Sequence, residues 1–242
     1  MFLKNHDIIG DALIDFFLGN KNAEMILNSQ WKINTKCILK SRETIPISVF
    51  FQDVNTMLEV DKQAINQCYG KVLDVGAAAG SHSMILEANN LVVYSIDISK
   101  GAVWVMRERG LTNVHHRDIK SYDEKMFDTI VFFGGNHGLF GNKNSYIQFL
   151  QKAKYMLTTT GQILISSPYI KIPIKNDSTD TFYYSDYTEL IMTLQYSDKK
   201  GKSFNWFMAH PDYILSLSKR ARWFGNAVNF DNNRTCLIRL TQ

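Results

Sequence analysis

Cysteine, net charge and long apolar runs are all scarce in this chain. The three cysteines (Cys37, Cys68 and Cys236) are far apart, odd in number and in no metal-ligand spacing, which argues against a disulfide framework and a structural metal site. No apolar run approaches the ~20 residues that a membrane-spanning helix needs. The net charge of +4 is too small to indicate nucleic acid or an anionic membrane as a partner.

The chain also lacks internal repeats, low-complexity segments and a start typical of a secretory signal, so we expect a reduced, cytoplasmic protein without a metal. What it does have is material for a core, because 45% of its 242 residues are hydrophobic and 12% are aromatic. This length and composition suit one large α/β domain, or one domain with an appended lid.

The most informative segment is KVLDVGAAAG, residues 71–80. Its apolar first half, interrupted only by Asp74, predicts a buried parallel strand. Gly76 permits a sharp turn with positive φ, and the small residues 77–80 let a ligand approach the backbone. A helix beginning at Ser81 would direct its free N–H groups at that ligand. The segment therefore predicts a nucleotide-binding element.

The spacing of the glycines fits a dinucleotide poorly. That fingerprint is Gly-x-Gly-x-x-Gly, whereas here Ala78 follows Gly76 and Ser81 stands where the third glycine would be. A carboxylate at Asp74 would repel a pyrophosphate, but it would suit a ligand with an ammonium group and no phosphate.

An acid followed by two such glycines resembles motif I of class I S-adenosylmethionine (SAM)-dependent methyltransferases. Ala78 replaces the middle glycine of that motif, and its extra methyl group should narrow the pocket slightly and leave binding possible.

Two further acids follow at the expected places. Asp97 ends a predicted strand over residues 91–97, where a carboxylate can accept both ribose hydroxyls. Asp118 closes a predicted third strand over 114–119, and the resemblance implies that it binds the adenine amino group while the backbone N–H of Ile119 binds a ring nitrogen. Three acids on three successive strand ends favour SAM as the cofactor.

The predicted cofactor-binding residues lie on these strand ends and on the turns after them. They are Asp74, Gly76, Ala77, Ala78, Gly80, His82, Ser83, Asp97, Ile98, Asp118, Ile119, Gly134 and Asn136. His82 could contact the methionine carboxylate, or it could have a structural role at the start of the helix.

Candidate catalytic residues are Asn136 and His137, in the loop after a predicted fourth strand over 126–133. A neutral imidazole could accept a proton from a hydroxyl or an amine. The alternative is that Asn136 shapes the loop beneath the methionine moiety and His137 is an exposed turn residue. Aromatic residues that could line an acceptor pocket, or simply cover the sheet, are Tyr169, Tyr183, Tyr184, Tyr187 and Trp206.

Strands and helices alternate along most of the chain, which predicts an α/β fold with a Rossmann-like, doubly wound, seven-stranded and mostly parallel sheet. The last three strands are expected at 161–167, 190–196 and 235–240. The resemblance implies the strand order 3-2-1-4-5-7-6, with the last strand antiparallel. A polar stretch over 171–187 is expected to be a mobile loop.

We expect two parts, an N-terminal helical cover or lid over residues 1–70 and a methyltransferase domain over 71–242. The cover should begin with an amphipathic helix at residues 8–17 and include a helix near 57–68. Residues 31–39 alternate loosely and could form a strand or an extended cover.

The chain also resembles a group of small, poorly characterised bacterial class I methyltransferases. The resemblance lies in Phe50-Phe51, the turn at 74–80, Gly134-Gly-Asn136, Phe204-Asn-Trp206 and Trp223-Phe-Gly225. In that group an arginine often follows the two aromatic residues, but here Gln52 stands there, which puts an inherited salt bridge to the cofactor carboxylate in doubt.

These features imply a SAM-dependent methyltransferase acting on an oxygen or nitrogen atom of a small-molecule acceptor. One alternative is a catalytically silent SAM-binding or regulatory protein. Another is an NAD(P)-dependent oxidoreductase, against which Asp74 and the missing third glycine argue. No Asn-Pro-Pro-Tyr or Asp-Pro-Pro-Tyr sequence, typical of methyltransferases that act on the amino groups of bases or glutamine, follows the fourth strand. This absence argues against nucleic acid as the substrate without excluding it. The acceptor and the oligomeric state stay open.

Overall fold

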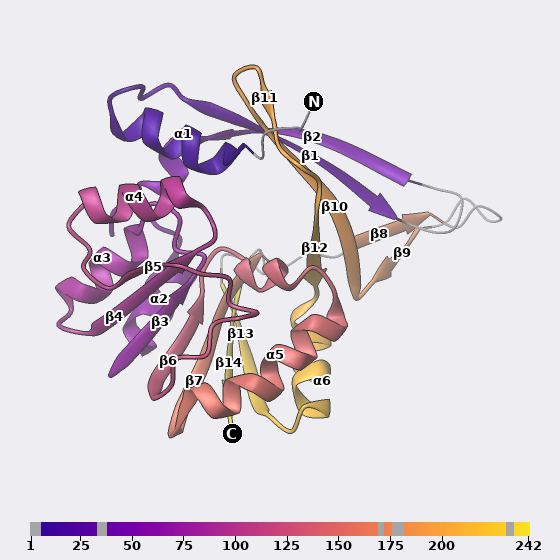
Figure 1. Cartoon of the computed structure of the whole chain (residues 1–242). Helices are drawn as coiled ribbons and strands as arrows, with labels where there is room; N and C mark the ends of the chain where they lie inside the picture. The colour runs from indigo at the N-terminus through magenta and orange to yellow at the C-terminus, as the bar shows by residue number, and fades with distance from the viewer. Residues whose placement is uncertain (1–5, 33–37, 169–171, 176–181, 231–234) are drawn as a thin grey trace.

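The computed structural model describes residues 6–32, 38–168, 172–175, 182–230 and 235–242, which form a large sheet with helices on both faces and a second, smaller sheet beside it (Figure 1). The α-helices are α1 (Ile8–Phe17), α2 (Glu59–Gln67), α3 (Ser81–Ala88), α4 (Lys100–Glu108), α5 (Lys143–Met156) and α6 (Pro211–Arg220). Two short 3-10 helices are η1 (Ile47–Phe50) and η2 (Asn136–Phe140).

The large sheet has seven strands in the order β13-β14-β7-β6-β3-β4-β5. Their bounds are β3 (Lys71–Val75), β4 (Val92–Asp97), β5 (Val114–His116), β6 (Phe127–Phe132), β7 (Leu157–Pro168), β13 (Phe224–Phe230) and β14 (Thr235–Thr241). The pairs among β3 to β7 are parallel, and β14 runs antiparallel to both of its neighbours. This confirms the predicted Rossmann-like, mostly parallel α/β sheet.

The strand order differs from the predicted one in the segment that supplies the sixth strand. We expected residues 190–196 there, and that assignment is wrong, because β13 takes the place beside β14. Residues 190–196 belong to β10 (Tyr187–Tyr196), which pairs antiparallel with β1 (Glu24–Lys32) and with β12 (Phe204–Ala209). An apolar strand can pair in either sheet, and only long-range pairing selects its partner.

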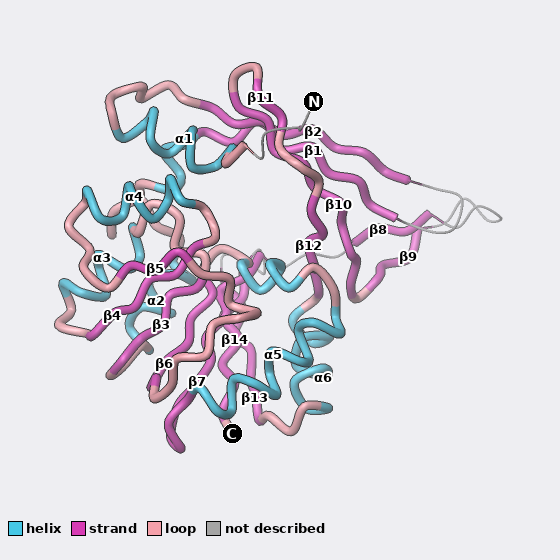
Figure 2. The backbone as a smooth tube through the Cα atoms, viewed as in Figure 1, coloured by secondary structure: helices cyan, strands magenta, loops and turns pink. Residues whose placement is uncertain are grey.

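The second sheet has the path β11-β10-β1-β2, with β12 also paired to β10. Its remaining strands are β2 (Ile38–Pro46) and β11 (Lys199–Lys200). Figure 2 shows this sheet above and beside the large one, with β10 and β12 reaching toward it. Within the polar stretch over 171–187, β8 (Ile172–Lys175) and β9 (Phe182–Ser185) pair antiparallel, while residues 169–171 and 176–181 lie outside the described part.

Alternating side chains of the large sheet pack against different helices on its two faces. Leu73, Ile130 and Ile163 join a core with α5 and α6, whereas their neighbours on the same strands join a core with α2 and α3, namely Val72, Val131 and Leu164. Because successive side chains of a strand point to opposite faces, continuous apolar runs are buried on both faces. The sheet therefore holds its carboxyl ends, where the acids were predicted, in a rigid frame.

The N-terminal segment packs directly on this frame. Helix α1 matches the predicted amphipathic helix, and Asp7 caps it by accepting a hydrogen bond from Gly10 N (3.1 Å). The other Asp7 oxygen accepts from Ser99 Oγ and Gly101 N, both at 2.9 Å, which ties α1 to the start of α4. Residues 1–70 contain β1 and β2 as well as helices, so the expected helical cover is a mixed segment, and its status as a separate domain stays a proposal. Within the described residues, no helix is long and apolar enough to cross a membrane.

Candidate functional site

The turn after β3 uses left-handed backbone at three of its five residues. The φ angle is +74° at Gly76, +50° at Ala78 and +79° at Gly80. A Cβ at Gly80 would lie 2.5 Å from Leu111 Cδ1, so a side chain there would have to displace Leu111 as well as adopt a strained φ. Ala78 adopts the conformation that a middle glycine would favour, at a cost of about 1–2 kcal/mol for an L-residue.

Asp97 ends β4, as the sequence predicted, and its side chain lies against this turn. Its carboxylate accepts hydrogen bonds from Ala78 N (3.0 Å) and Ser99 N (2.8 Å). Burial raises the pKa of Asp97 to about 6, while the two N–H donors oppose that shift. The second strand end and the glycine turn therefore form one site, and the carboxylate is largely ionised at neutral pH.

Asp74 has a different environment from the one expected. Its side chain is 1% exposed and accepts a hydrogen bond from Ser83 Oγ (2.6 Å), which in turn accepts from Ser95 Oγ (2.8 Å). Burial raises the pKa of Asp74, against the lowering effects of His82 and Ser83. The carboxylate faces the protein interior and joins β3, α3 and β4 beneath the turn.

His82 lies beside a second buried carboxylate that the sequence reasoning missed. Its ring stacks on Phe133 with centroids 4.0 Å apart, and its Nε2 lies 3.5 Å from Asp61 Oδ2. Ser166 Oγ donates a hydrogen bond to Asp61 Oδ1 and accepts one from Gly134 N (3.0 Å). This network fixes the loop after β6 to α2 and β7, and no local pattern identifies it because its members come from distant segments.

The third predicted acid lies just beyond the end of β5. Asp118 is exposed, and one of its carboxylate oxygens accepts from Lys120 N (2.9 Å). Ile119 is buried, whereas Ile98, directly after Asp97, is 64% exposed. Ile98 therefore exposes apolar surface directly beside the Asp97 carboxylate in the chain.

Asn136 ties the loop after β6 to the glycine turn. Its Nδ2 donates to Val75 O (3.1 Å) and to Gly76 O (2.9 Å). The amide therefore shapes the loop, which agrees with the structural alternative for this residue.

His137 is not the exposed turn residue of that alternative. It is 2% exposed, and among the described residues neither ring nitrogen has a hydrogen-bond partner. Burial lowers the pKa of His137 to about 4, so the imidazole is neutral at physiological pH.

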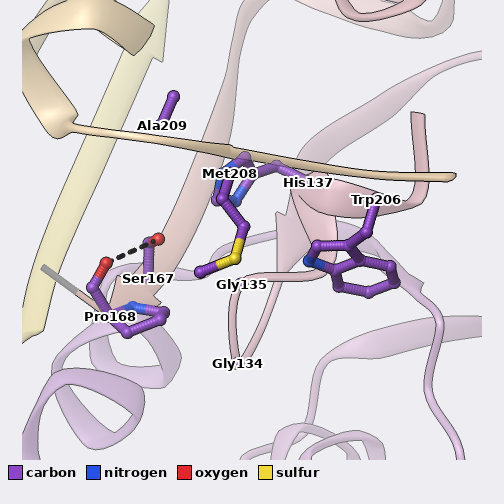
Figure 3. A pocket seen from close by; sticks show the side chains of 8 residues that line it. All are labelled: Gly134, Gly135, His137, Ser167, Pro168, Trp206, Met208 and Ala209. Atoms are coloured by element: carbon purple, nitrogen blue, oxygen red, sulfur yellow. Dashed lines mark hydrogen bonds between the residues drawn. The ribbon is translucent and has the colours of Figure 1, made fainter. Parts of the chain in front are cut away.

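His137 is one of the residues that line a small pocket between the loop after β6, the end of β7 and β12 (Figure 3). The pocket has a volume of about 40 Å³, and Trp206 and Met208 form part of its wall. At Gly134, on the same wall, an added Cβ would meet no atom within 4 Å.

Of the other predicted aromatic candidates, Tyr187 instead stacks on Tyr213, with centroids 4.5 Å apart. Tyr169 and the side chains of Tyr183 and Tyr184 lie outside the described residues.

The N-terminal segment reaches the glycine turn through Ser81 and Arg109. Ser81 Oγ donates to Phe50 O (2.8 Å), and Arg109 Nη1 donates to Ala79 O (2.6 Å). The Arg109 guanidinium also lies 5.1 Å from the centroid of the Phe51 ring. Gln52 donates to Thr56 O (3.3 Å) within its own loop. Nothing in the sequence singled out Arg109, which lies at the end of a helix.

Comparison with known proteins gives a consistent result. A family model described as a methyltransferase domain matches residues 69–209. A SAM-dependent methyltransferase from Bacteroides fragilis, solved in complex with S-adenosyl-L-homocysteine, is 25% identical, with a TM-score of 0.82 over 97% of this chain and 94% of that chain.

Two further solved structures share the fold alone. A glycopeptide N-methyltransferase, MtfA, is 12% identical over 75% of this chain and 85% of that one, with a TM-score of 0.57. A sugar N-methyltransferase from a Streptoalloteichus species is 12% identical over 76% and 85%, with a TM-score of 0.52. No curated protein sequence matches the chain.

Proposed function

The chain belongs to the methyltransferase-domain family, and from this membership we propose that it transfers a methyl group from SAM to an oxygen or nitrogen atom of a small molecule. The Bacteroides fragilis relative, which covers almost the whole chain, binds S-adenosyl-L-homocysteine, the product that SAM leaves after methyl transfer. The observation that carries the proposal is the Asp97 carboxylate, which ends β4 in contact with the glycine turn.

The residues around the turn fit such a cofactor. Asp97 has lone pairs left for the ribose hydroxyls, and the exposed Ile98 offers an apolar surface for adenine. Asp118 and the backbone of Ile119 are the proposed partners of the adenine edge. The open side of Gly134 leaves room for the methionine end of the cofactor.

The remaining predicted cofactor residues have supporting roles in this proposal. The turn consists of small residues that let a ligand approach its backbone, namely Gly76, Ala77, Ala78 and Gly80. Asp74, Ser83 and His82 hold that turn and the loop after β6 from within. Asn136 fixes the distance between the loop and Gly76.

When bound, SAM supplies a methyl group on a positively charged sulfur, which an in-line nucleophile can displace. The protein's contribution is then mainly alignment and the exclusion of water. Among the proposed catalytic pair, Asn136 positions the loop, and His137 offers a neutral nitrogen that can accept the proton of the acceptor.

Calorimetry with SAM and with NAD tests the cofactor. We expect SAM to bind and NAD not to bind, and NAD binding without SAM binding would contradict the proposal. Incubation with radiolabelled SAM and a metabolite extract then tests catalysis. Label transfer should be lost in Asp97→Ala and kept in Asp123→Ala, since Asp123 is an exposed acid outside the site. Tight SAM binding with no transfer to any extract would instead favour the silent SAM-binding protein.

A further inference from the structure

We infer that the pocket beside His137 takes an acceptor whose reacting atom is uncharged, a hydroxyl or a weakly basic aromatic amine carried on an apolar or aromatic body. This inference rests on the proposed methyl transfer and names the substrate class for it.

The first observation is the unpaired imidazole. Both ring nitrogens of His137 are buried and have no hydrogen-bond partner among the described residues. A polar group buried without a partner is costly, so buried polar atoms nearly always have one. The ring also lies edge-on to Phe207, with centroids 6.3 Å apart at 87°, which limits its freedom to turn toward solvent. A donor from a bound molecule would supply the missing partner.

The second observation is the character of the walls (Figure 3). Trp206, Met208 and Pro168 present apolar surface, and the Ser167 hydroxyl already donates to Pro168 O (3.2 Å). The described residues that line the pocket include no aspartate, glutamate, lysine or arginine. An ammonium group entering here would lose its water without gaining a counter-charge, whereas a neutral hydroxyl or aromatic amine would lose much less.

The third observation is where the pocket lies. Its wall includes Gly134, and the same loop is held against Gly76 by Asn136. The pocket therefore lies beside the loop after β6, and the same loop borders the proposed cofactor site. At about 40 Å³ it admits only the reacting end of an acceptor, so the rest of the molecule must lie outside, along Trp206.

The neutral imidazole completes the chemistry. The acceptor atom bonds to the methyl carbon while the carbon–sulfur bond breaks and leaves its electron pair on sulfur. The proton of the acceptor passes to a free nitrogen of His137 and then to water as the product leaves. A methylated hydroxyl or aromatic amine that still carries its proton is acidic, so a weakly basic imidazole suffices. An aliphatic amine is protonated at neutral pH and has no lone pair to react.

Three probes with the same aromatic body test this class: phenol, aniline and benzylamine. With the protein saturated by S-adenosyl-L-homocysteine at pH 7.5, we expect phenol and aniline to shift the ¹⁵N ring resonances of His137, which the His137→Phe variant assigns. Benzylamine should leave them in place. With labelled SAM, phenol and aniline should accept label, and His137→Phe should reduce that transfer at least tenfold. The control is His6→Phe, since His6 is exposed, and it should transfer normally.

Each contrary result has a distinct meaning. Preferential methylation of benzylamine overturns the inference and leaves the methyltransferase function standing. Absence of a His137 shift with both phenol and aniline, or undiminished transfer in His137→Phe, also overturns it. Failure of both SAM and S-adenosyl-L-homocysteine to bind would instead overturn the proposed function itself.

Discussion

Burial of His137 should make the stability of the fold depend on pH in a calculable way. The folded-state pKa is about 4, below the ordinary value of 6.5. Below pH 6.5 the unfolded chain binds a proton that the folded chain does not, so this residue weakens the fold as pH falls toward 4. The contribution of the neutral His137 side chain to the free energy of unfolding is fully present above pH 6.5. At pH 5.0 the loss from this one group is about 2 kcal/mol, since each pKa unit is worth about 1.4 kcal/mol.

The measurement is a difference between two proteins. Urea unfolding of the wild-type chain and of His137→Phe at pH 7.5 and 5.0 gives four free energies of unfolding. Between the two pH values, the wild type should lose about 2 kcal/mol more than the variant. Subtraction is needed because Asp97, whose pKa is raised to about 6, stabilises the fold as pH falls and partly cancels the effect in either protein alone.

Trp206→Phe is the matched control, because it alters the same pocket and keeps the imidazole. It should retain the pH dependence of the wild type. A difference between wild type and His137→Phe that stays within about 0.5 kcal/mol across the two pH values, or has the opposite sign, would refute the assignment of His137 as a buried neutral base.

Three further predictions concern the cofactor side. Asp74→Ala should lower the free energy of unfolding by about 1–3 kcal/mol, because the Ser83 hydroxyl loses its acceptor; weaker SAM binding by calorimetry with unchanged unfolding would show that Asp74 faces the ligand instead. Ala78→Gly should raise the free energy of unfolding by up to about 1 kcal/mol in urea titrations, because glycine adopts φ +50° without strain; a loss of stability would contradict this account of the turn. Asp97→Asn should weaken SAM binding at least tenfold in calorimetry, because charge-assisted hydrogen bonds are worth about 1.5–3 kcal/mol; equal affinities in this variant and in Asp123→Asn would remove Asp97 from the site.

Sequence patterns predicted the sheet well where strand and helix alternate locally. The helix expected over residues 8–17 begins as predicted, with the Asp7 side chain accepting a hydrogen bond from Gly10 N (3.1 Å). The four parallel strands β3 to β6 and helix α3, which begins at Ser81, also lie where the local patterns placed them. These features depend on neighbours within a few residues, which is the range over which periodicity, caps and turns act.

The prediction was wrong where pairing joins distant segments. Strand β10 satisfies the same apolar pattern as a strand of the large sheet, yet it pairs with β1, more than 150 residues earlier in the chain. The N-terminal segment, expected to be a helical cover, contributes two strands for the same reason. A strand's pattern encodes that it is half buried, and it does not encode against which sheet.

The sequence by itself determined the glycine turn, the three strand-end acids and hence the family of the cofactor site. Each depends on a short stretch of backbone whose geometry a few small residues dictate. Only the tertiary structure decided which polar side chains are buried and which partners they have. It turned Asp74 inward to Ser83, gave His82 a partner in Asp61, and buried His137 against β12 without a hydrogen-bond partner among the described residues. Burial and hydrogen bonding depend on what other segments bring to the same point, and that information lies in the packed chain rather than in any local pattern.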